Sequence, residues 1–275
     1  MEVNCEGCAG CCLDWRALHP GAPDPERAGR YVSLDDTDNL VPLTSDEVRR
    51  FIANGYGDAL VPRLFEAERG VEIDGYTLAA IGGKPAFYVG LRKREKPVAP
   101  FGLDPVRLPA CVFLDPETLQ CRIHGSALYP DTCATYPGDN LALGAETECE
   151  RVEAAFGGER LVDPTPPGTG PAFTTATLGA TVFGHPDPEA LSGRVGRLAA
   201  GDGTREDHAT FVAVAAASRP GGLEVSREKY ETARERVLAA ESWVSRAAAD
   251  EATPAEASAR EEREGAPATP GWDGV

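Results

Sequence analysis

The chain has 275 residues, 42% of them hydrophobic, and a formal net charge of −17 at pH 7. This length and apolar content are enough for a real core, but no apolar run approaches the ~20 residues that a membrane-spanning helix needs. The acidic excess argues against a nucleic-acid partner, because contacts with phosphates require clustered positive charge.

The N-terminus and the charged residues together predict a cytoplasmic protein. Residues 1–5 contain neither the basic start and apolar stretch of a signal peptide nor the small apolar residues that precede a lipoprotein cysteine. Arginine far outnumbers lysine, and an acidic, lysine-poor surface suits a halophilic cytoplasm, where salt screens self-repulsion. A GC-rich genome would also explain the scarcity of lysine, but not the acidic excess.

The chain begins with four cysteines within eight residues, Cys5-x-x-Cys8-x-x-Cys11-Cys12. Such a segment lacks the apolar neighbours that would bury four thiols in a core. Two residues between cysteines let a tight turn direct both sulfurs at one ion, and thiolate is a strong ligand for soft metals. Residues 1–43 are rich in glycine and proline, so we expect a loop wrapped around a metal site.

The eight cysteines of the chain also fit a framework of four disulfides. That alternative agrees poorly with the lack of a signal peptide, because disulfides are rare in a reducing cytoplasm. It also agrees poorly with the adjacent pair Cys11-Cys12, since neighbouring cysteines rarely bridge each other. Metal binding is therefore the preferred interpretation.

Between the two groups of cysteines the pattern changes from helix to strand. The sequence from Thr44 to Glu47 supplies a polar cap for a helix that follows it. Residues 58–69 are predicted to form a second helix. Residues 71–91 contain short β-type runs around a Gly82-Gly83 turn, which predicts a meander or a pair of hairpins.

The second group of cysteines begins in a predicted hairpin. Residues 111–114 and 121–124 resemble short strands joined by a turn at Asp115-Pro116, so Cys111 and Cys121 should lie close together. His124 is a further candidate ligand, although a histidine at a strand end is more often structural.

Two more cysteines follow the hairpin. Pro130 is placed to open a short helical turn that carries Cys133, and Pro137 is placed to end it. Cys149 comes next. We expect the N-terminal thiols to fold back onto this second group, because no other part of the chain is rich in thiols.

The second half of the chain changes from a proline- and glycine-rich crossing to helices. Residues 160–175 are predicted to be a linker, residues 176–249 a helical region, and residues 250–275 a disordered tail with almost nothing to bury. Thr204 and Ser226 are placed to cap helices that end near residues 218 and 249.

These elements predict an α+β fold in which a small, irregular, cysteine-rich metal-binding core with short hairpins and packed helices precedes the helical region. The cysteine-cluster domain would span residues 1–159, with a candidate insertion at about residues 70–98.

The cysteine motifs resemble those of the YkgJ-type cysteine-cluster family, which is described as zinc- or iron-chelating. The resemblance rests on the opening Cys-x-x-Cys-x-x-Cys-Cys, the hairpin cysteines, and Cys133-Ala-Thr-Tyr136-Pro137. It covers about residues 1–155. The resemblance implies a metal site built from cysteines. Tyr129-Pro130 stands where that family usually has Arg-Pro, so no role of that arginine carries over.

All eight thiols are candidate metal ligands: Cys5, Cys8, Cys11, Cys12, Cys111, Cys121, Cys133 and Cys149. One structural zinc takes four ligands, and the chain offers twice as many. Adjacent Cys11 and Cys12 would more naturally serve two metals, or one cluster and its surroundings. The Cys-x-x-Cys-x-x-Cys spacing also resembles the one that holds three corners of a [4Fe–4S] cluster, with Cys121 or Cys133 as a remote fourth.

An iron–sulfur cluster or iron is therefore the preferred cofactor, with a redox or electron-transfer role and an unidentified redox or protein partner. The alternative is a zinc-binding module with a structural or metal-handling role, because the same thiols suit zinc. Flagellin lysine methylases contain a similar cysteine region, which makes cluster-assisted methyl transfer a third alternative. The chain has no recognisable methyl-donor site or phosphate loop, and no catalytic residue is predicted.

Overall fold

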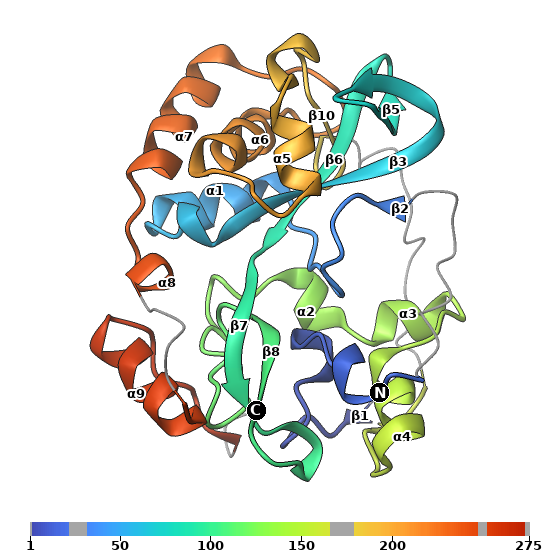
Figure 1. Cartoon of the computed structure of the whole chain (residues 1–275), viewed down its shortest axis with the longest axis vertical. Coiled ribbons are helices and arrows are strands. Elements are labelled where there is room, and N and C mark those ends of the chain that lie inside the picture. Colours follow the sequence, from blue (N-terminus) through green and yellow to red (C-terminus); the bar gives the residue numbers. More distant parts are fainter. Residues whose placement is uncertain (1, 22–31, 166–178, 247–251, 273–275) are drawn as a thin grey trace.

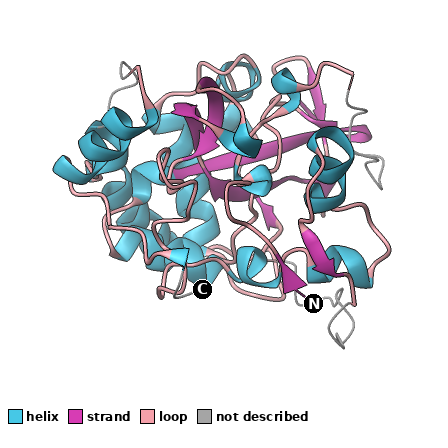
Figure 2. Ribbon diagram, turned by 90° about the horizontal axis from the view of Figure 1, so that it is seen from below, coloured by secondary structure: helices cyan, strands magenta, loops and turns pink. Residues whose placement is uncertain are grey.

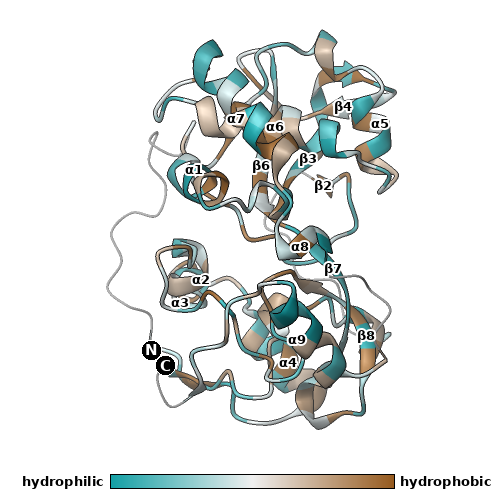
Figure 3. Ribbon diagram, turned by 90° about the vertical axis from the view of Figure 1, so that its left-hand side faces the viewer, coloured by the Kyte–Doolittle hydropathy of each residue, from teal (hydrophilic) through white to brown (hydrophobic). Residues whose placement is uncertain are grey.

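The computed structural model describes residues 2–21, 32–165, 179–246 and 252–272. It confirms an α+β composition, with helices and antiparallel sheets (Figure 1; Figure 2). The elements gather into an upper and a lower body, and the side view in Figure 3 shows the same division. Within the described ranges, no helix combines the length and apolar character needed to cross a membrane.

The upper body is built on a pair of long antiparallel strands. β3 (Leu60–Ile73) pairs with β6 (Lys84–Leu91) from Leu60↔Leu91 to Leu64↔Phe87. Shorter strands extend this sheet in the order β10-β6-β3-β2, with two more beside it. These are β2 (Val32–Ser33), β4 (Tyr76–Leu78), β5 (Ala80–Ile81) and β10 (Phe183–Gly184).

The helix α6 (Arg205–Ala217) forms the centre of the upper body, packed against β3 and between α1 (Ser45–Ala53) and α7 (Arg227–Ala239). Its residues from 209 to 218 are all buried, which fits a helix that is apolar on every side. The Phe211 ring meets the Phe87 ring of β6 edge-on at 5.0 Å between centroids. This contact joins the helices to the sheet.

The predicted caps are confirmed. The Thr44 hydroxyl accepts a hydrogen bond from Glu47 N, and the Glu47 carboxylate accepts one from Thr44 N, which makes a capping box at the start of α1. Thr204 and Asp207 form the same arrangement at the start of α6, and Ser226 caps α7. These helix starts depend on neighbours in the sequence, so local patterns find them.

The lower body contains the strand pair β7 (Lys93–Val98) and β8 (Val106–Cys111), together with short helices. β7 continues from β6 after a single residue, Arg92, and so connects the two bodies (Figure 1). The remaining elements are η1 (Gly10–Cys12), η2 (Arg16–Leu18), α2 (Asp131–Thr135), α3 (Gly138–Ala142), α4 (Glu148–Phe156) and the pair β1 (Glu2–Val3) and β9 (Leu161–Asp163).

Further short elements complete the fold. In the upper body these are η3 (Gly57–Ala59), η6 (Glu189–Leu191) and α5 (Arg194–Ala199). The lower body adds η4 (Pro100–Gly102), and α8 (Trp243–Arg246) lies at the junction of the bodies (Figure 3).

One predicted helix is wrong, and another ends earlier than predicted. Residues 58–69 form η3 and the first part of β3, because pairing with β6 on one side and with β2 and β4 on the other outweighs local helix preference. The helix predicted to reach residue 249 ends instead at Ala239. Ala240 has an extended backbone, and the chain then turns through α8, where Trp243 is buried.

The predicted disordered tail is also wrong over its described part. Residues 254–263 form α9, which Thr253 caps, and Ala257, Ser258 and Glu261 of this helix are buried. The helix lies against β7 in the lower body (Figure 1). The composition of the tail predicted nothing to bury because α9 buries only small residues and one charged residue. That residue, Glu261, pairs with Lys96 of β7 at 2.6 Å.

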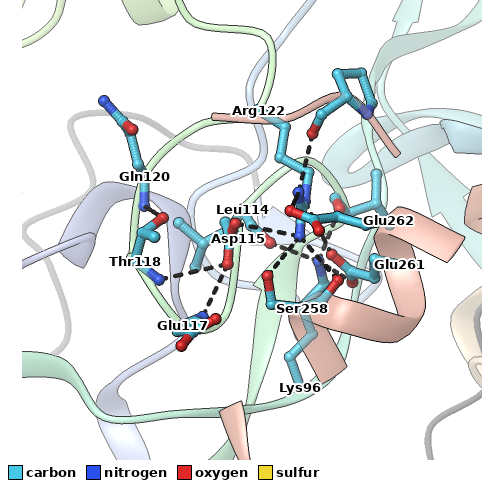
Figure 4. Close-up of polar contacts among 12 residues, drawn as sticks. Lys96, Leu114, Asp115, Glu117, Thr118, Gln120, Arg122, Ser258, Glu261 and Glu262 are labelled. Atoms are coloured by element: carbon cyan, nitrogen blue, oxygen red, sulfur yellow. Dashed lines mark hydrogen bonds and ion pairs between the residues drawn. The ribbon is translucent and has the colours of Figure 1, made fainter. Parts of the chain in front are cut away.

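A buried ion-pair network joins α9 to the cysteine hairpin (Figure 4). The Arg122 side chain, which is fully buried, contacts the carboxylates of Asp115 at 3.2 Å and Glu261 at 3.1 Å. Lys96 Nζ donates to the carbonyl oxygens of Val112 and Leu114. The network therefore fixes the backbone between Cys111 and Cys121 to the last helix of the chain.

Candidate metal centre

The N-terminal cysteine segment lies against strand β8. Leu13 makes a bridge with Ala110, and Asp14 N donates to Pro109 O at 2.8 Å. Leu13 is fully buried, so an apolar anchor directly after Cys12 fixes the segment to the core. The N-terminal segment therefore folds back beside the strand that carries Cys111.

Cys111 and Cys121 lie close together, as the hairpin pattern predicted. Cys111 ends β8, Leu114 N donates to Cys111 O at 2.9 Å, and Leu114 bridges Cys121. The turn between them is fixed by Asp115, whose carboxylate accepts from Glu117 N at 2.9 Å. The second strand is shorter than predicted, because only this single bridge forms.

Cys133 lies on α2, which begins after Pro130 as predicted. Asp131 N, at the start of this helix, donates to the Glu47 carboxylate of α1 at 2.8 Å. Tyr129 OH donates to Cys133 O at 3.3 Å. The His124 ring packs on the Tyr129 ring, with centroids 4.6 Å apart, so this histidine has a structural neighbour beside the site.

Cys149 lies in the first turn of α4, which packs against η1. Trp15 Nε1 donates to the Glu148 carboxylate at 2.9 Å, and the Trp15 ring is buried with Cys8 and Val152. Gly10 permits this approach, because a Cβ on it would lie 2.7 Å from Val152 Cγ2. The fold thus brings Cys149 to the N-terminal thiols.

All eight predicted ligands lie in the described part of the chain and all are free thiols, so none of the four disulfides of the alternative reading is formed. Cys8 and Cys111 are buried, while Cys5 and Cys11 are exposed residues. The sulfurs of Cys11 and Cys12 are 4.0 Å apart. The cysteine region therefore reaches from the core to the surface.

Burial and neighbouring thiols shift the acidities in this region. Burial raises the pKa of Cys121 to about 12, and the charge of Cys111 adds to this. The pKa of Cys11 is lowered, chiefly by its side-chain hydrogen bond with Cys12. Cys11 is therefore the thiol that ionises most readily beside a set of protonated neighbours, and a metal would have to displace their protons.

Within the described residues, no three side chains of His, Cys, Asp or Glu are arranged closely enough to hold a single metal ion. Binding would therefore require the sulfurs to draw together. The N-terminal segment consists of short turns around Gly7 and Gly10 and has few regular hydrogen bonds, so it is the element that can adjust.

Two cations beside the thiols were not predicted. Lys93 lies directly opposite Cys111 in the β7–β8 ladder, so both side chains extend from the same face. Arg160 Nη1 donates to Glu6 O, between Cys5 and Cys8. One signal for Lys93 was present in the sequence, since a lysine inside a strand of a lysine-poor acidic chain is unusual.

The fold and the cysteine region define an α+β protein with a thiol-rich centre in its lower body. The chain belongs to a family of unknown function (DUF7531), whose model matches residues 1–273. No curated protein and no solved structure is significantly similar to it.

The resemblance to the YkgJ-type family is wrong. The family that matches covers nearly the whole chain, including both bodies of the fold, and no YkgJ-type match is found. The physical reason is that a cysteine motif constrains only the few residues that approach a metal. Unrelated chains can therefore share its spacing, whereas membership of a family depends on the core.

Proposed function

We propose that this protein binds a metal through its cysteine thiols, with an iron–sulfur cluster or iron as the preferred cofactor and electron transfer as its role. The observation that carries the proposal is that eight free thiols from separate parts of the chain lie on elements that pack together in the lower body. They come from the N-terminal turn and η1, the β8 hairpin, α2 and α4.

The chemistry of the region supports iron–sulfur ligation. Cysteine thiolates hold the irons of such clusters, and neighbouring cations and limited solvent access tune their potentials. The buried side of the region provides low solvent access at Cys8 and Cys111, while Cys5 and Cys11 lie at the surface. An electron carrier needs both features, a protected centre and an edge that a partner can approach.

Zinc is the second candidate, because eight thiols equal two complete tetrahedral sets of four. In that case the centre would have a structural or metal-handling role, and it would have no redox chemistry of its own.

Anaerobic purification followed by iron, zinc and acid-labile sulfide analysis decides between the two. We expect a brown protein that contains iron and sulfide in similar amounts. Zinc without sulfide, in a colourless protein, would establish the second candidate. A protein that contains neither metal and binds neither after reconstitution under reducing conditions would overturn metal binding altogether.

Chelation of the metal is expected to loosen residues 2–21 and leave the helices between residues 179 and 246 formed. The first segment is mostly turns, so metal binding would contribute much of its order. In contrast, α6 is buried in the upper body, away from the cysteines. Hydrogen exchange with and without chelator measures both segments, and equal loss of protection in the two would contradict this prediction.

A further inference from the structure

We propose that the eight cysteines form two separate four-thiol metal sites, each beside its own cation; this rests on the proposed metal binding. The N-terminal set consists of Cys5, Cys8, Cys11 and Cys149. The hairpin set consists of Cys12, Cys111, Cys121 and Cys133.

The thiols of the two sets lie beside two different hydrophobic clusters. Cys111 belongs to the main hydrophobic core, and Cys12 and Cys121 pack against that core. Cys8 belongs instead to a separate small cluster with Trp15 and Val152, which α4 contributes. Cys149 precedes Val152 by three residues on the same helix, so it lies on the side of the second cluster.

The adjacent cysteines Cys11 and Cys12 supply one ligand to each set. Both belong to the 3₁₀ helix η1, in which successive side chains diverge by about 120°. Cys12 is half-buried against the main core, whereas Cys11 is an exposed residue. Their sulfurs remain 4.0 Å apart, so two sites that share this pair would be close neighbours.

The contacts of the outlying thiols agree with the division. Cys8 N donates to Cys5 O at 3.1 Å, so Cys5 lies beside the cysteine of the small cluster. Tyr129 OH donates to Cys133 O, and the Tyr129 ring packs on the ring of His124 in the hairpin, so Cys133 lies on the hairpin side.

Each set also has a cationic nitrogen that lacks a partner. Among the described residues, Lys93 Nζ and Arg160 Nε are buried and have no hydrogen-bond partner. Lys93 faces Cys111 across the ladder, and Arg160 lies at the backbone of Glu6 in the N-terminal set. Four thiolates around one divalent ion leave an excess of negative charge, and a cation beside each site would offset it.

The test counts metal centres by titrating the reduced full-length protein with Co²⁺ alone, since tetrahedral thiolate coordination of this ion absorbs visible light strongly. We expect two equivalents in the wild type, and one each in Cys5→Ser and Cys133→Ser. These cysteines are among the less buried members of their sets, so their replacement disturbs the core little. Circular dichroism confirms that each variant is folded.

Replacing the two cations is a second test, and it leaves every sulfur in place. Lys93→Met is expected to weaken Co²⁺ binding roughly 10–100-fold at the site that Cys133→Ser abolishes, and Arg160→Met at the site that Cys5→Ser abolishes. Lys93→Arg, which keeps the charge, is the matched control and should bind nearly as the wild type does.

The outcomes separate the two proposals. One equivalent of Co²⁺ that is lost completely in both cysteine variants would overturn the two-site assignment and leave metal binding intact. Loss at both sites in Lys93→Met would overturn the pairing of each cation with one set. A wild type that binds no Co²⁺ and contains no metal when purified would overturn the proposed function itself.

Discussion

Replacing Glu261 with alanine is expected to lower the free energy of unfolding by about 3–5 kcal/mol, the usual cost of removing one partner from a buried ion pair. The Glu261 carboxylate is 4% exposed and pairs with Lys96 and Arg122, whose side chains are 3% and 0% exposed. Without it, two buried cations lose a counter-charge. Burial already lowers the pKa of Lys96 to about 8, so this lysine would release its proton at neutral pH.

The matched control is Glu262→Ala. Glu262 is the next residue of α9 and lies 3.8 Å from Arg122, but its side chain is 53% exposed. Its pair with Arg122 is therefore expected to contribute below about 1 kcal/mol. Urea denaturation of the two variants measures the difference, and equal destabilisation would show that the network contributes no more than a surface pair.

Acidification from pH 6.5 to pH 4 is expected to destabilise the protein by up to about 3 kcal/mol for each of two histidines. The pKa of His185 and of His208 is lowered from 6.5 to about 4, in both cases chiefly by burial. The unfolded chain binds protons at these residues near pH 6.5 and the folded chain only near pH 4. Their contribution to stability is thus complete above pH 6.5 and is lost as the pH falls to 4.

His208→Gln isolates one of these contributions. His208 Nδ1 lies 3.2 Å from Arg92 Nη2 and must stay unprotonated to accept its hydrogen bond, and the positive charge of Arg92 further lowers the pKa of His208. Glutamine retains an acceptor but does not titrate. The loss of stability between pH 6.5 and 4 should therefore be smaller in the variant, whereas exposed His19→Gln should match the wild type.

Local chemistry was predictable where the interacting residues are neighbours in the sequence. The caps at Thr44, Thr204 and Ser226 and the helical turn that carries Cys133 were all predicted, because a cap joins residues three positions apart. The helix predicted over residues 58–69 failed because the first part of β3 depends on pairing with β6, whose partner residues lie between 23 (Leu64↔Phe87) and 31 (Leu60↔Leu91) positions further along the chain.

The sequence pointed to the thiols of the candidate site but not to the cations beside them. Cysteine spacing identified the eight thiols, and the turn at Asp115 predicted the approach of Cys111 and Cys121. Lys93 and Arg160 could not be assigned to the site from spacing. Lys93 meets Cys111 through strand register, and Arg160 reaches the N-terminal cysteines through the β1–β9 pair.

The sequence by itself determined that this is an acidic α+β protein with eight cysteines in two groups, because charge, periodicity and spacing are properties of the chain. Only the tertiary structure decided which thiols share surroundings and that the last helix closes on the cysteine hairpin. Those relations depend on contacts between residues far apart in the chain. Arg122 and Glu261 form their buried ion pair only once the fold has placed α9 beside the cysteine hairpin.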